Sequence, residues 1–117
     1  MIADDYEPIR NRIRQILSDE KDMEVNCEAS TGQEVLDLPC TGEMDVLVLD
    51  FHLPDMNALD LLPKLRVKFP RLKILVLSAM SQGMYAAKLI SMGAAGFVDK
   101  ETASEDLVRT IREVLVQ

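Results

Sequence analysis

Acidic, hydroxyl and amino side chains stand at four places in this sequence where an apolar run ends. The residues are Asp4 with Asp5, Asp50, Ser78 and Lys100. Three neighbouring carboxylates repel one another unless a cation joins them, and oxygen ligands of this kind suit Mg²⁺. A hydroxyl and an ammonium beside the ion would complete a clamp for a tetrahedral dianion, and a carboxylate oxygen could act as the nucleophile. The set therefore indicates phosphoryl transfer onto an aspartate.

The central apolar run is the stretch from 46 to 49, which ends at Asp50 and is soon followed by Pro54. A short continuous aliphatic run is typical of a strand that is buried on both faces of a parallel sheet. Ligands of such sheets bind at the carboxyl ends of the strands. Taken alone, Asp50 is better explained as the first residue of a turn. Its role depends on what the other strands bring to the same edge.

Strand patterns alternate with helix patterns along the whole sequence. The expected strands are 1–3, 23–29, 46–50, 74–77 and 95–98. The expected helices run from Pro8, over 30–39, from Asn57 to Phe69, from Ala86 to Gly93, and from Thr102 onward. Asn57 is the predicted cap of its helix, and Thr102 with Glu105 forms a capping-box pattern. This alternation predicts one doubly wound α/β domain, in which every polar strand end lies on one edge.

Composition excludes several classes of function. The 117 residues suffice for one domain, and the net charge of −7 argues against nucleic-acid binding by this domain alone. The basic group from Arg10 to Arg14 is better explained as the solvated face of a helix. No window approaches the ~18 apolar residues of a membrane span, and the early acidic pair excludes a signal segment, so we expect a cytoplasmic protein. Cys27 and Cys40 lack zinc or redox spacing and are expected to be reduced.

The sequence resembles the receiver domain of two-component response regulators over essentially its whole length, and the NarL/FixJ type is most similar. The acidic pair Asp4-Asp5, the stretch 49–56 around Asp50, the pair Ser78-Ala79 and Lys100 match the motifs of that family. The resemblance implies a flavodoxin-like (βα)5 fold over residues 1–117, with a five-stranded parallel sheet in the order 2-1-3-4-5.

The resemblance also implies roles for the residues of the acidic edge. Asp50 would accept a phosphoryl group from a sensor histidine kinase or a phosphotransfer protein. Asp5, Asp50 and the backbone carbonyl of His52 would ligate Mg²⁺, with Asp4 acting through water. Such a protein promotes its own phosphorylation and dephosphorylation and is not a turnover enzyme. The aspartyl-phosphate phosphatases have a second Asp two residues after the nucleophile. This sequence has His52 at that position, which argues against this class of enzyme.

Two further residues would convert phosphorylation into a change of surface. Ser78 and Lys100 would hold the phosphoryl oxygens, and Phe97 matches the switch aromatic of the family. Movement of Ser78 and Phe97 would alter the surface of the last two helices and of the strand between them. That surface would control a transcriptional output domain or a partner. A homodimer remains open. The alternative is a constitutive interaction module whose partner binds regardless of phosphorylation.

Three positions depart from the usual family pattern. Ala58 stands where many relatives have glycine, and Glu101 follows Lys100 where many have proline. No C-terminal helix-turn-helix domain is expected within residues 1–117. The first strand is truncated, with only residues 1–3 before the acidic pair. We hypothesise that a central strand this short lowers stability and favours association through the gap.

Overall fold

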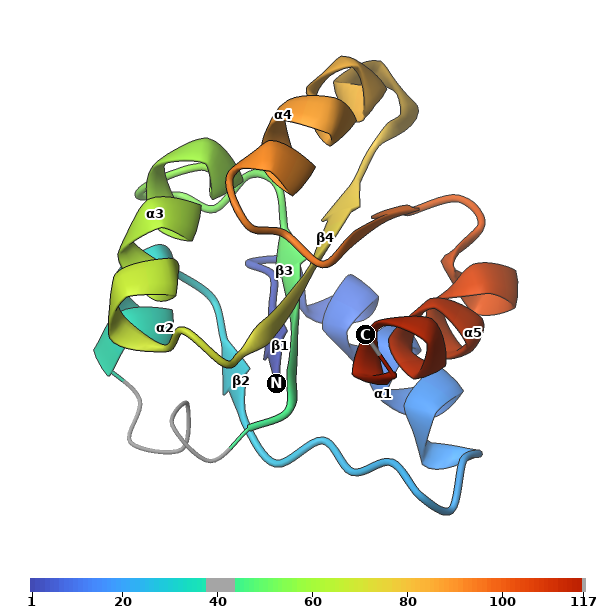
Figure 1. Cartoon of the computed structure of the whole chain (residues 1–117). Helices are drawn as coiled ribbons and strands as arrows, with labels where there is room; N and C mark the ends of the chain where they lie inside the picture. The colour runs from blue at the N-terminus through green and yellow to red at the C-terminus, as the bar shows by residue number, and fades with distance from the viewer. Residues whose placement is uncertain (38–43, 117) are drawn as a thin grey trace.

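Five parallel strands form the sheet in the order β2-β1-β3-β4-β5, as predicted (Figure 1). The computed structural model describes residues 1–37 and 44–116. The strands are β1 (Ile2–Ala3), β2 (Glu28–Ala29), β3 (Val46–Asp50), β4 (Lys73–Ser78) and β5 (Gly96–Asp99). Because all of them run in one direction, their carboxyl ends meet at a single edge of the sheet.

Helices cover both faces of this sheet. They are α1 (Glu7–Ser18), α2 (Gly32–Asp37), α3 (Ala58–Lys68), α4 (Ala86–Ser91) and α5 (Ala103–Leu115), with a 3-10 helix over Met80–Tyr85. The helices α1 and α5 lie on one side, and α2, α3 and α4 lie on the other (Figure 1). Among the described residues, no helix is both long and apolar enough to cross a membrane.

The apolar runs of the two longest strands fill a core on each face. Leu47, Leu49, Ile74 and Val76 belong to the cluster under α2, α3 and α4. Val48, Leu75 and Leu77 belong to the cluster under α1 and α5. Since side chains of a strand alternate between faces, a continuous aliphatic run is what a sheet covered on both sides requires.

The edge formed by β2 differs from the prediction. A strand was expected over 23–29, but only Glu28–Ala29 pairs with β1. The physical reason is that β1 itself has two residues, so the stretch before β2 has no partner strand.

Cys27 is disulfide-bonded, which corrects the expectation of a reduced thiol, since spacing along a chain does not reveal which cysteines meet in the fold. Cys40 lies outside the described residues.

The ends of the helices match the sequence signals in part. The Asn57 side chain accepts from the amide of Asp60 at 3.0 Å in a full capping box, as predicted. Thr102 occupies the N-cap of α5 but makes no side-chain cap, so the predicted capping box there is wrong. Ala58 is the first residue of α3, and no described residue other than glycine has a positive φ. Alanine therefore fits this position without strain.

Candidate functional site

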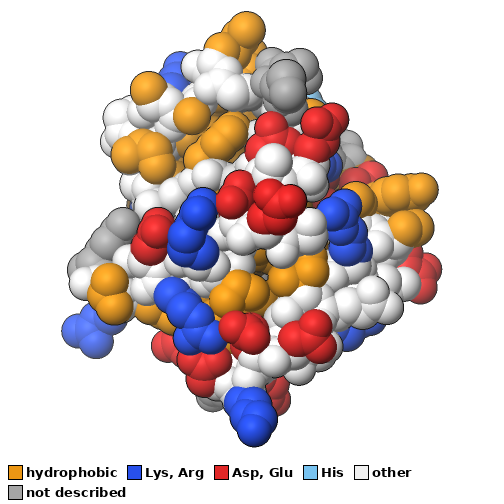
Figure 2. Space-filling view, turned by 90° about the vertical axis from the view of Figure 1, so that its right-hand side faces the viewer, with side chains coloured by type: hydrophobic (Ala, Val, Ile, Leu, Met, Phe, Trp, Pro, Cys, Tyr) orange, Lys and Arg blue, Asp and Glu red, His pale blue; other side chains and the backbone are white. Residues whose placement is uncertain are grey.

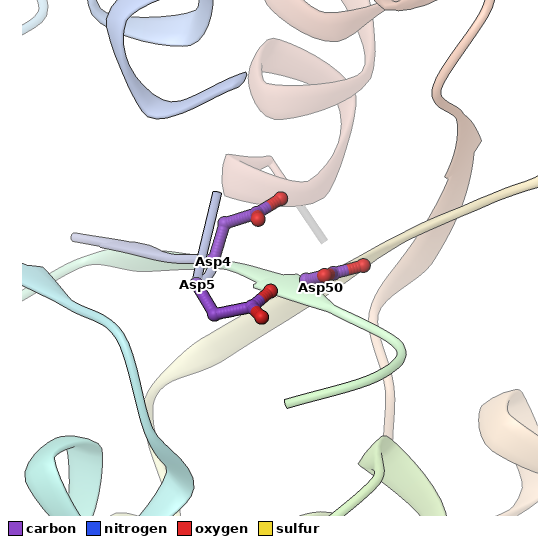
Figure 3. Close-up of side chains that lie close together, drawn as sticks. All are labelled: Asp4, Asp5 and Asp50. Atoms are coloured by element: carbon purple, nitrogen blue, oxygen red, sulfur yellow. The ribbon is translucent and has the colours of Figure 1, made fainter. Parts of the chain in front are cut away.

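Three carboxylates converge at the carboxyl edge of the sheet (Figure 3). Asp4 and Asp5 follow β1, and Asp50 ends β3. One carboxylate oxygen from each lies within 4.8 Å of the others. Asp5 is exposed, whereas Asp4 and Asp50 are only 1% and 4% exposed. The sequence prediction that these residues meet is confirmed by this geometry.

Lys100 brings a positive charge to Asp50. Its Nζ lies 2.8 Å from Asp50 Oδ1, in an ion pair rather than an aligned hydrogen bond. The backbone holds Lys100 in place, because its amide donates to the carbonyl of Ser78 at 2.8 Å. Burial raises the pKa of Asp50, and Lys100 opposes that shift. Ionised Asp50 is therefore costly in this site unless further positive charge is present.

Three buried oxygens at this edge make no hydrogen bond within the described part of the chain. They are Asp4 Oδ2, Ser78 Oγ and Asp50 Oδ1, of which the last has the ion pair with Lys100. The other Asp4 oxygen accepts from the amide of Tyr6 at 2.9 Å. Burial is the main cause that raises the pKa of Asp4, and the neighbouring charge of Asp50 adds to it. Buried polar atoms are almost always satisfied, so this geometry fits a bound cation and a bound anion.

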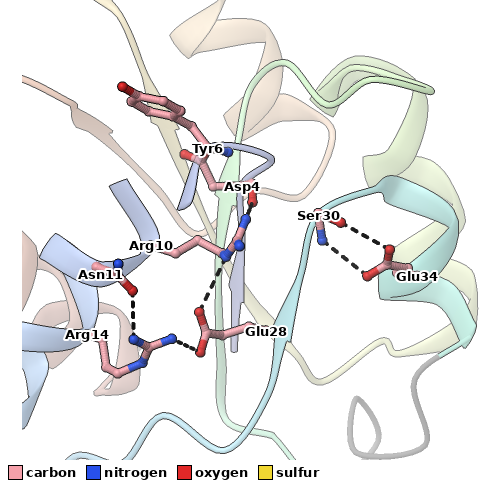
Figure 4. Close-up of polar contacts among 8 residues, drawn as sticks. All are labelled: Asp4, Tyr6, Arg10, Asn11, Arg14, Glu28, Ser30 and Glu34. Carbon is pink, nitrogen blue, oxygen red and sulfur yellow. Dashed lines mark hydrogen bonds and ion pairs between the residues drawn. The ribbon is translucent and has the colours of Figure 1, made fainter. Parts of the chain in front are cut away.

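Arg10 supports the acidic pair, and the sequence analysis missed it. Its guanidinium donates to the backbone carbonyl of Asp4 at 2.5 Å and pairs with Glu28 at 3.4 Å (Figure 4). Arg14 pairs with the same Glu28 carboxylate. The basic group of α1 is therefore not simply a solvated face, because Arg10 and Glu28 tie the end of β1 to α1 and β2. No pattern in the sequence pointed to this contact.

The loop after Asp50 is fixed at both ends. The amide of Phe51 donates to the carbonyl of Leu77 at 3.0 Å, and the amide of Ala58 donates to the carbonyl of Phe51 at 2.8 Å. Asp55 reaches across to the start of α2, where it accepts from the amides of Gly32 and Gln33 at 2.8 and 2.9 Å. This loop therefore connects the site to α2 and to α3.

Two predicted residues lie beside the carboxylates rather than among them. His52 is exposed, and its ring lies nearly perpendicular to the Phe51 ring, with centroids 4.9 Å apart. Phe97 stands opposite Val76 in the sheet and is half-buried against the cluster under α2, α3 and α4. Ser78 is fully buried and stands opposite Asp99. The strands thus place a hydroxyl, an ammonium and three carboxylates at one edge.

A comparison of the sequence with known protein families agrees with the acidic site at this edge of the sheet. The family model of the response regulator receiver domain matches residues 1–112. The chain belongs to this family. Receiver domains are signalling modules of two-component systems that interact with histidine kinases or phosphotransfer partners, and they generally bind Mg²⁺.

Curated relatives and a solved structure resemble this receiver domain over nearly its whole length. Response regulator UvrY of Escherichia coli K12 is 32% identical over 114 residues, which cover 97% of this chain and 52% of UvrY. The nitrate/nitrite response regulator NarL of the same organism is 30% identical, over 97% of this chain and 52% of NarL. The chain therefore spans about half the length of these relatives.

The solved structure is the receiver domain of AraT, a response regulator from Geobacillus stearothermophilus. It has a TM-score of 0.85 and 32% sequence identity, and the match covers 98% of this chain and 90% of that one. The flavodoxin-like architecture predicted from the sequence is thereby confirmed.

Proposed function

We propose that this receiver domain accepts a phosphoryl group on Asp50 from the phosphohistidine of a sensor histidine kinase or a phosphotransfer protein. One observation carries the proposal. Asp50 is only 4% exposed, yet it has an ammonium at 2.8 Å and two further carboxylates nearby. A carboxylate that served only to begin a turn would not need to be buried beside an ammonium and two other carboxylates.

The transfer itself is a displacement at phosphorus. A carboxylate oxygen of Asp50 forms the new P–O bond while the P–N bond to the donor histidine breaks. The histidine nitrogen keeps the electron pair and takes up a proton. Lys100 then faces the oxygens of the acyl phosphate, and the buried hydroxyl of Ser78 donates to one of them. Lys100 and Ser78 thus stabilise the negative charge of the phosphoryl oxygens, which the apolar side chains of the core could not do.

Mg²⁺ is the cofactor that the donor set fits. Asp5, Asp50 and the backbone carbonyl of His52 would hold the ion, and Asp4 would act through water. Support comes from the unsatisfied Asp4 Oδ2 and from the burial that raises the pKa of Asp4 and Asp50. When bound, the ion supplies positive charge that offsets both the carboxylates and the phosphoryl oxygens.

Phosphorylation would be transmitted through Ser78 and Phe97. Ser78 moves towards the new oxygens and draws the segment after β4 with it, and Phe97 turns inward to fill the vacated space. The surface of α4, β5 and α5 changes as a result. That surface then controls a transcriptional output domain or a partner protein.

Intact mass measured after incubation with acetyl phosphate and Mg²⁺ tests the proposal. The protein should gain roughly 80 Da, the mass of one phosphoryl group. Asp50→Asn should abolish the gain, whereas Asp99→Asn, a matched change at the end of β5, should retain it. A gain that survives in Asp50→Asn contradicts the assignment. No gain in the unaltered protein favours the constitutive interaction module instead.

A further inference from the structure

Asp5 receives the least support among the three carboxylates of the acidic site. The side chain of Asp4 accepts from the amide of Tyr6. The side chain of Asp50 faces the ammonium of Lys100. Asp5 is exposed, and its carboxylate has no hydrogen bond or ion pair within the part of the chain that the structure describes. Its place beside the other two carboxylates therefore depends on the backbone that carries it.

The peptide unit between Asp4 and Asp5 is fixed from two sides. The amide of Asp4 donates to the carbonyl of Ala29 in β2 at 3.0 Å. The carbonyl of Asp4 accepts from the guanidinium of Arg10 in α1 at 2.5 Å (Figure 4). A charged donor makes this bond stronger than one between neutral groups. Because a peptide unit is planar, a bond that fixes the carbonyl of Asp4 also fixes the amide of Asp5.

The guanidinium of Arg10 is held in place by a second contact. Its Nε lies 3.4 Å from Oε1 of Glu28 in β2. The other oxygen of this carboxylate pairs with Arg14, which also donates to Asn11 at 2.8 Å. The side chains of Arg10 and Glu28 are only 19% and 28% exposed, so water and salt screen their attraction less than that of a fully exposed pair. A planar guanidinium bound at two of its nitrogens keeps one orientation.

The position of Arg10 separates it from an ordinary surface cation. Charged side chains of both signs are interspersed over the face that α1 and α5 cover (Figure 2), so a solvated arginine is expected on α1. Arg12 fits that description, because it is exposed. Arg10 is largely buried and contacts the backbone of the acidic pair instead. The two arginines carry the same charge on the same helix and therefore allow a matched comparison.

We propose that Arg10 is a positioning residue for Mg²⁺ binding, which orients Asp5 through the carbonyl of Asp4. Glu28 holds the guanidinium in the orientation that this contact requires. The inference rests on the proposed Mg²⁺ site. Groups that orient a metal ligand typically change the affinity for the metal roughly 10- to 100-fold. The charge of Arg10 alone acts in the opposite direction, because it repels a second cation. Removal of Arg10 thus separates the two roles by the sign of its effect.

Isothermal titration calorimetry of the metal-free protein with MgCl₂ tests the proposal, at a temperature where circular dichroism shows each variant to be folded. Arg10→Ala should raise the dissociation constant for Mg²⁺ about tenfold. Arg12→Ala, which removes the same charge from the same helix, should leave it unchanged. Arg10→Lys keeps the charge, but a single nitrogen cannot hold both the carbonyl and Glu28, so its dissociation constant should be intermediate.

An unchanged or lower dissociation constant in Arg10→Ala overturns the proposal, and Arg10→Lys applies the same criterion if the alanine variant does not fold. This result, with Mg²⁺ binding intact in the unaltered protein, leaves the proposed function standing. Absence of Mg²⁺ binding in the unaltered protein would contradict both the proposed Mg²⁺ site and the role of Arg10.

Two further measurements test the route from Arg10 to Asp5. Glu28→Ala should raise the dissociation constant severalfold in the unaltered protein but not when Arg10 is already alanine, since Glu28 acts through Arg10. In heteronuclear NMR spectra of the metal-free protein, Arg10→Ala should shift the amide of Asp5, which shares a peptide unit with the Asp4 carbonyl. Arg12→Ala should not shift it. Additive effects of Glu28 and Arg10, or an unmoved Asp5 amide in Arg10→Ala, contradict this route.

Discussion

The ring of Phe51 stacks on the ring of Tyr85, with centroids 5.2 Å apart and planes inclined by 28°. Phe51 directly follows Asp50, and Tyr85 is the residue before α4. The backbone of Phe51 is fixed to β4 through its hydrogen bond to Leu77. The stacked pair therefore joins the loop of the acidic site to the segment that leads into α4.

A double-mutant cycle would measure this contact. We expect Phe51→Leu and Tyr85→Leu to be coupled by about 0.5–1.5 kcal/mol, the usual contribution of an aromatic pair beyond its buried area. The free energies of unfolding come from urea titrations of the single and double variants. Tyr85→Leu combined with Val67→Ala, which lies on the exposed face of α3, is the control. Strictly additive effects in the aromatic pair would show that the stacking contributes nothing.

Stability should depend on pH through Asp4 and Asp50. Burial raises the pKa of both carboxyls in the folded protein. A raised pKa favours folding below the unfolded-state value, and this contribution is lost as the pH rises through the folded-state pKa. Without Mg²⁺, the free energy of unfolding should therefore contain a component that falls with rising pH. Added Mg²⁺ should restore stability at neutral pH.

Asp4→Asn isolates part of this effect. The amide keeps an oxygen that can accept from the amide of Tyr6, but it removes a buried charge. In EDTA we expect a Tm a few degrees above that of the unaltered protein at about pH 7.5, with a smaller gain at about pH 4. Asp19→Asn, an exposed change after α1, should show neither. An Asn variant with a lower Tm at neutral pH would contradict the predicted cost of the charge.

Lys100 should compete with a cation for Asp50. Because its ammonium lies 2.8 Å from Asp50 Oδ1, Lys100→Ala removes a positive charge from the carboxylate cluster. We expect the dissociation constant for Mg²⁺ to fall roughly fivefold, equivalent to about 1 kcal/mol. Isothermal titration calorimetry measures it, with Lys88→Ala on α4 as the control. Weaker Mg²⁺ binding by Lys100→Ala than by Lys88→Ala would mean that the two cations do not share this site.

Asp55 should stabilise the start of α2. It accepts from the amides of Gly32 and Gln33, and these bonds lower the pKa of Asp55. A lowered carboxyl pKa contributes stability above the unfolded-state value, which is lost as the pH falls through the folded-state pKa. Asp55→Ala should thus lower the Tm at neutral pH, with the difference closing as the pH falls through the lowered folded-state pKa of Asp55. Faster amide exchange confined to α2 would accompany it. A Tm difference that persists at low pH would exclude this cause.

The sequence predicted those parts of the fold that depend on local patterns. The aliphatic runs that end at Asp50 and Ser78 identify β3 and β4, because only strands covered on both faces are apolar without interruption. The polar residues that follow the strands then meet at one edge for topological reasons. Strand order thus accounts for Asp50 and Lys100 reaching the same edge, but it does not predict the ion pair between them, because β4 lies between β3 and β5.

Contacts between distant segments could not be read in the same way. The contact of Arg10 with the Asp4 carbonyl depends on the packing of α1 against β1, and the pattern of α1 shows only that Arg10 is polar. The cap that Asp55 provides comes from a different loop, so no local capping signal marks it. Thr102 shows the converse, because a local pattern can be present while its side chain remains unused.

Identification of the modified residue is the most direct test of phosphoryl transfer to Asp50. The protein is incubated with acetyl phosphate and Mg²⁺, and borohydride then reduces the acyl phosphate to an alcohol. This converts the phosphorylated aspartate to homoserine, which is roughly 14 Da lighter than unmodified aspartate. Tandem mass spectrometry should find the change at Asp50, and EDTA should prevent it. A change at Asp4, Asp5 or any other residue, or no change while Mg²⁺ is present, would contradict the proposed function.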